Sequence, residues 1–357
     1  MYSRNQSKLL SVIGGGGHEV NFYDVISLEN LLAAWREFKR GKTGRLDVAQ
    51  FAFNLEDNLF ALRSALADGS WRPDSYISFN VIDPKLRRVH KASVRDRVLH
   101  QALFRKLYPV FDKTFIHASY SSRKGKGTHA GVSRLEDFIR KASANYTKQL
   151  FALKCDVRKF FDSISHSILL EIIAKYISDF DIIRLIERII ISFETTSGRG
   201  LPLGNVTSQL FANVYLNDLD QYTKRVLKVR YYIRYCDDFV ILAETRRELQ
   251  EIIPALHLFL KSQLRLTLHS GKISIRKVKQ GVDFLGYVVL PNYRVLRTQT
   301  KKRIMASFMR QTIAAKTEAE KEFLKIISYS YKGILIHCRG YHIWRQLDTM
   351  ADYCSEN

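Results

Sequence analysis

Cysteine and long apolar runs are both scarce in this 357-residue sequence. The four cysteines are Cys155, Cys236, Cys338 and Cys354. They are spaced too widely for a zinc knuckle, and a chain of this length does not need a disulfide framework. We therefore expect free thiols in a reducing, cytosolic compartment. No stretch of about eighteen apolar residues occurs, so we expect no membrane-spanning helix and no membrane partner.

Acidic residues are also too few to balance the basic ones. Asp and Glu total 35 and Lys and Arg total 57, which gives a formal net charge of +22. Such an excess favours a polyanionic partner, and nucleic acid is the first expectation. A basic surface without a nucleic-acid function is the alternative. The hydrophobic content of 46% fits an ordered globular chain, long enough for two or three subdomains.

Two of the acids that are present stand side by side. The tetrapeptide Tyr235-Cys236-Asp237-Asp238 lies between apolar, β-forming residues on both sides. This pattern predicts a β-hairpin that carries paired carboxylates at its tip. Two carboxylates in close contact repel by about 1 kcal/mol even in bulk water, and a divalent cation removes that conflict. The hairpin therefore predicts a metal-dependent phosphoryl-transfer enzyme.

A third acid, Asp156, ends another apolar stretch. Residues 150–157 are predicted to form a buried strand, and a basic segment follows. If this strand lies beside the hairpin, Asp156 lies next to Asp237, and the two carboxylates can hold two Mg²⁺ ions about 4 Å apart. An isolated Asp at a strand end is otherwise a common turn former. The order of the three acids along the chain is more informative than any one of them.

Strands and helices interleave in the middle of the sequence and helices dominate both ends, which predicts an α+β fold. Ser27 can cap a helix over residues 28–39. A second helix is predicted where apolar residues recur every three or four positions over residues 48–66. Residues 76–92 alternate as a basic hairpin, with a turn at residues 83–85.

The order of a single acid, a glycine-containing loop and a paired-acid hairpin resembles the palm of reverse transcriptases. Residues 156–161, 200–209 and 235–238 resemble the first palm motif, the second palm motif and the Tyr-x-Asp-Asp box. The next palm motif, the primer grip and two fingers segments of bacterial members are resembled by residues 266–272, 282–287, 95–98 and 120–129. The resemblance implies a right-hand polymerase of fingers, palm and thumb, with an RRM-like antiparallel palm sheet and a helical thumb.

The resemblance also implies where the domains lie. They are a leader at 1–26, N-terminal helices and fingers at 27–149, a palm at 150–290 and a helical thumb at 291–357. The leader contains the glycines at 14–17. Within the palm, residues 158–200 are partly a helical fingers insertion.

Matching positions imply a two-metal polymerase site. Asp156 and Asp237 would bind two Mg²⁺ ions, for which Mn²⁺ is a substitute. Asp238 would be the third acid, and the backbone carbonyl of Val157 would be a further metal ligand. Lys272 matches a lysine that protonates the departing pyrophosphate, although a lysine in such a turn is otherwise simply solvated.

The resemblance also implies residues that contact the substrate. Phe161 matches a bulky gate that excludes the ribose 2′-hydroxyl and so selects deoxynucleoside triphosphates (dNTPs); outside this motif a phenylalanine is usually core. Tyr235, Gly204 and Gln209 would lie against the nucleotide or template. Leu203 stands where retroviral and group II intron enzymes carry glutamine. Leucine has no donor to offer, so we expect looser control over the nascent base pair.

Basic residues outside the palm are implied to bind phosphates. Lys85 and Arg87 would hold the incoming triphosphate, and Arg88 competes for this role. Two further sets are implied to contact nucleic acid, Arg123, Lys124 and Lys126 in a glycine-punctuated loop and Lys301, Lys302 and Arg303 on the thumb. A solvated charged loop is the alternative for the first of these sets.

Residues 203–209 indicate a branch of the family. An aliphatic residue, glycine, three residues and Ser-Gln resembles the reverse transcriptases of diversity-generating retroelements. This implies a bacterial or phage-encoded enzyme that copies a template-repeat RNA into primer-linked cDNA with errors at adenines. It also implies a partner, the pentameric accessory variability protein. The alternatives are a standalone bacterial reverse transcriptase of phage-defence or group II-like type, and a non-catalytic RNA-binding scaffold.

Overall fold

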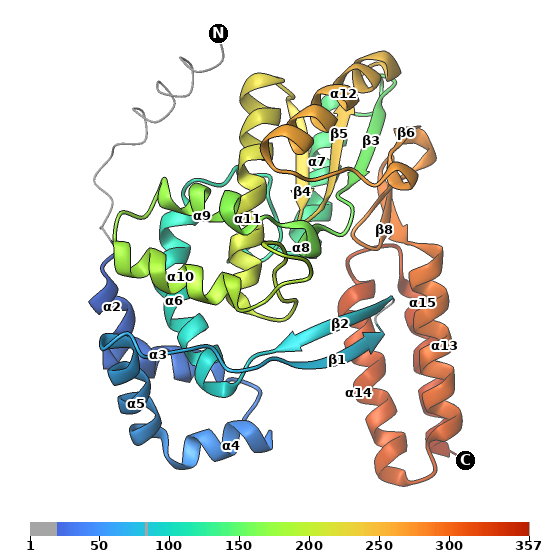
Figure 1. The fold of residues 1–357 in the computed structure, drawn as a ribbon. Coiled ribbons are helices and arrows are strands. Elements are labelled where there is room, and N and C mark those ends of the chain that lie inside the picture. The colour runs from blue at the N-terminus through green and yellow to red at the C-terminus, as the bar shows by residue number, and fades with distance from the viewer. Residues whose placement is uncertain (1–19, 83–84, 357) are drawn as a thin grey trace. The chain divides into compact units, whose positions relative to one another are not determined.

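The computed structural model describes residues 20–82 and 85–356, and its elements are drawn in Figure 1. The chain forms two compact units, each built from separate stretches of sequence. The first is Met1–Phe115, Lys159–Asp218 and Gln263–Leu266, and the second is Ile116–Arg158, Leu219–Ser262 and Thr267–Asn357. The predicted leader glycines at 14–17 and positions 83–84 of the predicted hairpin turn lie outside the described residues.

Helices make up most of the first unit. They are α2 (Phe22–Ile26), α3 (Leu28–Phe38), α4 (Leu46–Phe53), α5 (Leu55–Ala67), α6 (Val94–Asp112), α8 (Phe160–Ser163), α9 (His166–Ala174), α10 (Phe180–Ile191) and most of α11 (Val206–Gln221). Ser27 caps α3 as predicted, because its side chain accepts a hydrogen bond from the Asn30 amide. The single helix predicted over residues 48–66 is wrong. Asn54, at φ −112° and ψ 45°, separates α4 from α5.

The basic hairpin predicted in the first unit is confirmed. Strand β1 (Ile77–Ile82) pairs with β2 (Leu86–Lys91) in antiparallel register, with Val81 opposite Arg87. The loop before α11 is attached to this hairpin, since the His90 amide donates to the Leu203 carbonyl at 3.0 Å. The hairpin and the Leu203 loop therefore form one local substructure.

A four-stranded sheet organises the second unit. Its strands lie in the order β4 (Tyr231–Tyr235), β5 (Asp238–Ala243), β3 (Phe151–Asp156) and β6 (Ser274–Lys277), and each pairs antiparallel with its neighbours. Ile233 and Val240 belong to a core cluster with α7 (Thr128–Ala142). Tyr232 and Phe239, which alternate with them, are also fully buried. Burial of both faces explains why these strands read as nearly continuous apolar runs.

A smaller sheet and three helices complete the second unit. Strands β7 (Val282–Phe284), β8 (Tyr287–Leu290) and β9 (Tyr293–Leu296) form an antiparallel sheet, and the helices α13, α14 and α15 follow it (Thr298–Ala314, Glu318–Leu335 and Tyr341–Glu356). Thr317 and Glu320 form a reciprocal capping box at the start of α14. The long helix α12 (Arg246–Gln263) lies between β5 and β6 in the sequence.

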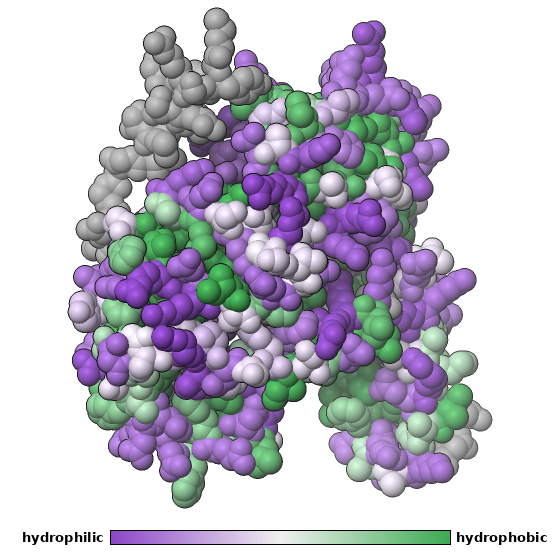
Figure 2. Space-filling model, viewed as in Figure 1, coloured by the Kyte–Doolittle hydropathy of each residue, from purple (hydrophilic) through white to green (hydrophobic). Residues whose placement is uncertain are grey.

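The surface agrees with the composition. Figure 2 shows hydrophilic side chains over much of the displayed face, with hydrophobic ones between them. Among the helices that the structure describes, none has both the length and the apolarity needed to cross a membrane.

Candidate active site

The three predicted acids come together at one end of the four-stranded sheet. Asp156, the last residue of β3, stands directly opposite Asp238, the first residue of β5. Asp237 lies in the two-residue connection between β4 and β5. The Val157 amide donates to the Asp237 carbonyl at 3.1 Å, which ties this connection to the end of β3. Strand pairing alone therefore gathers carboxylates that are about eighty residues apart in the sequence.

The surroundings of these acids disfavour their negative charge. Burial, followed by the nearby Asp156 carboxylate, raises the pKa of Asp237 above its ordinary value. Burial also raises the pKa of Asp238 to about 6, and Lys154 opposes that rise. The Oδ1 atom of Asp238 is buried and has no hydrogen-bond donor among the described residues. A site of this kind has a strong electrostatic demand for a cation.

Mg²⁺ fits this set of donors. Hard carboxylate oxygens suit it, and it keeps waters and substrate phosphates in its shell, so few protein ligands are needed. Within residues 20–82 and 85–356, no group of three or more His, Cys, Asp or Glu side chains is placed to hold a metal ion by itself. Asp156, Asp237 and Asp238 supply oxygens of the kind that Mg²⁺ prefers, and waters or phosphates would complete its shell.

Two lysines provide positive charge next to the acids. The Lys272 ammonium lies 2.6 Å from Asp156 Oδ1, so the structure brings this predicted residue to the site. It ends a short 3-10 turn, η2 (Ser270–Lys272), and the preceding His269 amide donates to the Asp156 carbonyl at 2.8 Å. The predicted role of Lys272 as a proton donor remains a prediction.

Lys154 is a second basic residue beside the acids, and it is not among the predicted site residues. Its Nζ atom lies 3.2 Å from Asp238 Oδ2 and donates to the Asp283 carbonyl at 2.9 Å. Arg297 contacts the Asp283 carboxylate in turn. A signal was available, because residues two apart on a strand share a face. A lysine two positions before Asp156 is therefore placed to reach the same group of acids.

Tyr235, the first residue of the Tyr-x-Asp-Asp box, packs into the structure of the second unit. It lies against the buried core cluster of that unit, and its hydroxyl accepts a hydrogen bond from Thr128 Oγ1 at 3.4 Å. These contacts anchor the start of the connection between β4 and β5 to α7. A contact with the nucleotide remains a prediction.

The other residues predicted to contact the nucleotide or template belong to the first unit. Phe161 lies in α8, is half-buried, and accepts a backbone hydrogen bond from Leu201 at 2.9 Å. Leu203 is half-buried beside the hairpin, and Gln209 is exposed on α11. Gly204 has φ +115°, and a Cβ there would meet Val89 Cγ1 at 2.9 Å. Glycine is therefore needed where this loop touches the hairpin.

The hairpin gives a physical reason to prefer Arg87 over Arg88. Alternate residues of a strand face opposite sides, so Arg87 shares its side with Val89, the residue that approaches Gly204. Arg88 lies on the opposite side. Lys85, Arg87 and Arg88 are all exposed. Their role in triphosphate binding remains a prediction.

The two predicted nucleic-acid contact sets both lie in the second unit, one in a loop and one on a helix. Arg123 donates to the carbonyls of Ile116 and Ser119, and Lys126 donates to the His117 carbonyl. These two side chains brace their own loop, whereas Lys124 is exposed. The thumb set is exposed on α13, and its first two lysines border an apolar groove; the set is Lys301, Lys302 and Arg303.

Comparisons with known proteins agree with this geometry. The family described as "Reverse transcriptase (RNA-dependent DNA polymerase)" matches residues 83–289. Protein YkfC of Escherichia coli (strain K12) is 24% identical over 266 residues, covering 63% of this chain and 69% of YkfC. The group II intron-encoded protein LtrA of Lactococcus lactis subsp. cremoris is 21% identical over 331 residues, covering 73% of this chain and 53% of LtrA. The chain therefore spans about half the length of LtrA.

The chain is also similar to two solved telomerase structures. The telomerase of Candida albicans in complex with a TWJ fragment of telomeric RNA has a TM-score of 0.47 and 10% identity, covering 83% of this chain and 64% of that one. The apo telomerase of Candida tropicalis has a TM-score of 0.47 and 12% identity, covering 65% of this chain and 50% of that one. The predicted α+β polymerase class is confirmed by the family match together with the antiparallel sheet that carries the acids.

Proposed function

We propose that this chain, which belongs to the reverse transcriptase (RNA-dependent DNA polymerase) family, is an RNA-directed DNA polymerase that extends a primer with dNTPs. The observation that supports this most directly is the register of Asp156 opposite Asp238, with Asp237 in the adjoining connection. Three acids at one sheet end, one of them with a buried oxygen that lacks a donor among the described residues, suit a divalent cation.

The chemistry follows from the roles of these residues. Asp156 and Asp237 would hold two Mg²⁺ ions, with Asp238 and the Val157 carbonyl nearby in the chain. Bound Mg²⁺ would neutralise the phosphoryl oxygens and favour attack of the primer 3′-hydroxyl on the α-phosphorus. Lys272, which already contacts Asp156, would give a proton to the departing pyrophosphate. Phe161 would exclude ribonucleotides, so Phe161→Ala should raise ribonucleotide incorporation.

Primer extension with Mg²⁺ tests this function. Wild-type protein should incorporate dNTPs on a primed RNA template, and Asp237→Asn should reduce incorporation to background. Asp57→Asn, which alters an exposed acid of α5, is the matched control and should extend the primer normally. Equal incorporation by wild type and Asp237→Asn would reject the two-metal assignment. A non-catalytic RNA-binding scaffold would show RNA binding with no incorporation in either protein.

We further propose that the enzyme belongs to a diversity-generating retroelement. The pattern of Leu203, Gly204 and Ser208-Gln209 supports this, since Leu203 offers no side-chain donor to the nascent base pair. The template would be a template-repeat RNA, and the accessory variability protein would be a partner. Sequencing of cDNA provides the test. Wild type should misincorporate at template adenines, and Leu203→Gln should lower that error rate.

A group II-like reverse transcriptase is the second candidate. The matches to LtrA and to the "Putative COX1/OXI3 intron 2 protein" of Saccharomyces cerevisiae, 19% identical over 257 residues, favour it. The two candidates predict different errors, since a group II-like enzyme has no reason to concentrate mistakes at adenines. An adenine error rate equal to that at the other template bases would favour the second candidate.

A further inference from the structure

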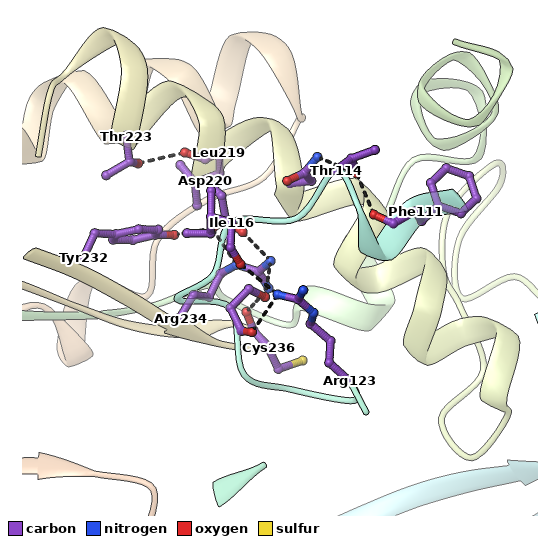
Figure 3. A network of polar contacts seen from close by, with 12 residues as sticks. Phe111, Thr114, Ile116, Arg123, Leu219, Asp220, Thr223, Tyr232, Arg234 and Cys236 are labelled. Carbon is purple, nitrogen blue, oxygen red and sulfur yellow. Dashed lines mark hydrogen bonds and ion pairs between the residues drawn. The ribbon is translucent and has the colours of Figure 1, made fainter. Parts of the chain in front are cut away.

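A buried ion pair between Arg234 and Asp220 lies close to Cys236, the first residue of the connection between β4 and β5, and is drawn in Figure 3. The Arg234 guanidinium binds the Asp220 carboxylate through two hydrogen bonds, Nε to Oδ1 at 2.7 Å and Nη2 to Oδ2 at 2.6 Å. Both side chains are fully buried. The Tyr232 hydroxyl also donates to Asp220 at 2.7 Å, and Arg234 Nη2 donates to Ser119 at 3.2 Å.

Stability alone is a poor reason for such a pair. Burying an arginine and an aspartate costs several kcal/mol per ion, and apolar side chains of similar volume are often as stable or more stable. The ion pair is therefore better explained by a role, other than stability, that apolar side chains could not fulfil. One Arg234 contact points to that role, because Nη1 donates to the Cys236 carbonyl at 3.0 Å.

Cys236 is the position in this connection where the backbone most needs support. It is the first of the two residues between β4 and β5, and its φ is +54°. Glycine and asparagine adopt this region readily, whereas other residues do so at a cost on the order of 1–3 kcal/mol. A hydrogen bond to the Cys236 carbonyl fixes the peptide group that joins Cys236 to Asp237.

The peptide group on the other side of Asp237 is fixed as well. The Val157 amide donates to the Asp237 carbonyl at 3.1 Å. The peptide planes before and after the Asp237 Cα are therefore both held, one by Arg234 and one by Val157. Holding both planes restrains φ and ψ of Asp237, and these two angles set the direction of its side chain.

We infer that Arg234 and Asp220 are positioning residues of the polymerase site, which fix the Cys236–Asp237 peptide so that the Asp237 carboxylate is presented beside Asp156. This inference rests on the proposed function. Asp220 holds the guanidinium in place, and Arg234 transmits that placement to the backbone. Neither side chain needs to touch substrate or metal for this role.

The test separates positioning from folding. The triple variant Arg234→Met, Asp220→Leu and Tyr232→Phe removes the buried charges together with the hydroxyl that would lose its partner. It should remain folded, with a Tm close to that of wild type. Its kcat for dNTP incorporation should fall on the order of tenfold to a hundredfold, with a smaller change in KM. Thr223→Val, which removes another buried hydroxyl of the same region, should leave kcat unchanged.

Arg234→Lys is the second variant, in case the triple variant does not fold. It keeps a positive charge beside Asp220 but loses the planar fork, and it should show the same fall in kcat. Mn²⁺ binding, measured by electron paramagnetic resonance, is the readout that does not depend on turnover, and both variants should bind Mn²⁺ more weakly than wild type.

The outcomes are distinguishable. A folded variant with wild-type kcat and wild-type Mn²⁺ affinity would overturn the positioning role. A wild type that never extends a primer would reject the proposed function instead. In that case weaker Mn²⁺ binding by the variants would still support the positioning role, and unchanged Mn²⁺ binding would overturn it too.

Discussion

Asp156 of β3 and Asp238 of β5 stand directly opposite each other in an antiparallel strand pair. Opposed side chains in such a pair have Cβ atoms about 5 Å apart, where like charges are destabilising. Each acid has its own ammonium partner, Lys272 for Asp156 and Lys154 for Asp238. The pairing of β3 with β5 therefore concentrates negative charge at this end of the sheet, and two lysines offset part of the repulsion.

Removal of one opposed carboxylate should separate activity from stability. Asp156→Asn should abolish dNTP incorporation. It should also raise the free energy of unfolding in Mg²⁺-free buffer by up to about 1 kcal/mol, because repulsion with the facing acid is relieved. The lost contact with Lys272, whose side chain is 40% exposed, should offset only a small part of this gain.

Urea unfolding with and without Mg²⁺ checks both parts of this prediction. Wild type should gain stability on addition of Mg²⁺, and Asp156→Asn should gain less. The exposed-acid variant Asp57→Asn should respond like wild type. A large loss of stability in Asp156→Asn would show that Asp156 is held mainly as a structural ion-pair partner.

The contact between Lys154 and Asp238 should be energetically coupled. Lys154 is 23% exposed and Asp238 is 22% exposed, so water screens the pair only in part. A double-mutant cycle with Lys154→Met and Asp238→Asn should give a coupling energy on the order of 1 kcal/mol. The exposed helical pair Arg247–Glu251 is the matched control and should give about 0.3 kcal/mol. Equal coupling energies in the two cycles would show that the Lys154–Asp238 contact is no stronger than a solvent-exposed ion pair.

Sequence reasoning located the three acids of the candidate site because local patterns encode them. Asp156, Asp237 and Asp238 each follow or precede an apolar run, and strand pairing brings such run ends together. Lys272 was also located, since it is the last residue of a recognisable palm motif at 266–272. The hydrogen-bonded network of Arg234, Asp220 and Tyr232 beside Cys236 could not be located in this way. Asp220 lies on a helix and Arg234 within a strand, and nothing in the spacing of two buried charged residues says that they meet.

The helical break at Asn54 was missed for a related reason. Val48, Phe51, Leu55 and Leu59 keep helical spacing across it, so periodicity alone predicts one helix. Asn54 instead adopts a non-helical conformation, and the Asn58 side chain donates to the Phe51 carbonyl across the break. Such local side-chain to backbone bonds compete with helix continuation, and they are settled by packing rather than by pattern.

His100 should make the stability of the protein depend on pH. It is buried in α6 with a side chain that is 2% exposed. Burial, helped by Arg97, lowers the pKa of His100 to about 4. The unfolded chain has the ordinary value near 6.5 and therefore takes up a proton first as the pH falls. The contribution of neutral His100 is thus fully present above about pH 6.5 and is lost progressively down to about pH 4, by up to ~3 kcal/mol.

Urea unfolding at about pH 7, above the window set by the two pKa values, and at about pH 5.5 and 4.5, inside it, measures this effect. His100→Leu should lose less stability than wild type across the series. His257→Leu, which replaces an exposed histidine of α12, should follow the wild-type curve. Parallel curves for wild type and His100→Leu would show that His100 does not titrate differently in the folded state.

The contact between Gly204 and the hairpin should be intolerant of any side chain. At φ +115° a Cβ at residue 204 would come within 2.9 Å of Val89 Cγ1. Gly204→Ala should push the loop away from β2 and weaken the hydrogen bond from His90 to Leu203.

Gly41→Ala is the matched control, since Gly41 also has positive φ, +66°, but no atom lies within 4 Å of a Cβ there. We expect Gly204→Ala to lower the free energy of unfolding by at least about 1 kcal/mol more than Gly41→Ala, and to raise the KM for dNTP. Adding Val89→Ala to Gly204→Ala should restore part of the free energy of unfolding and part of the affinity for dNTP. If Gly204→Ala unfolds as easily as Gly41→Ala and no more so, the loop and the hairpin are not held together at this point.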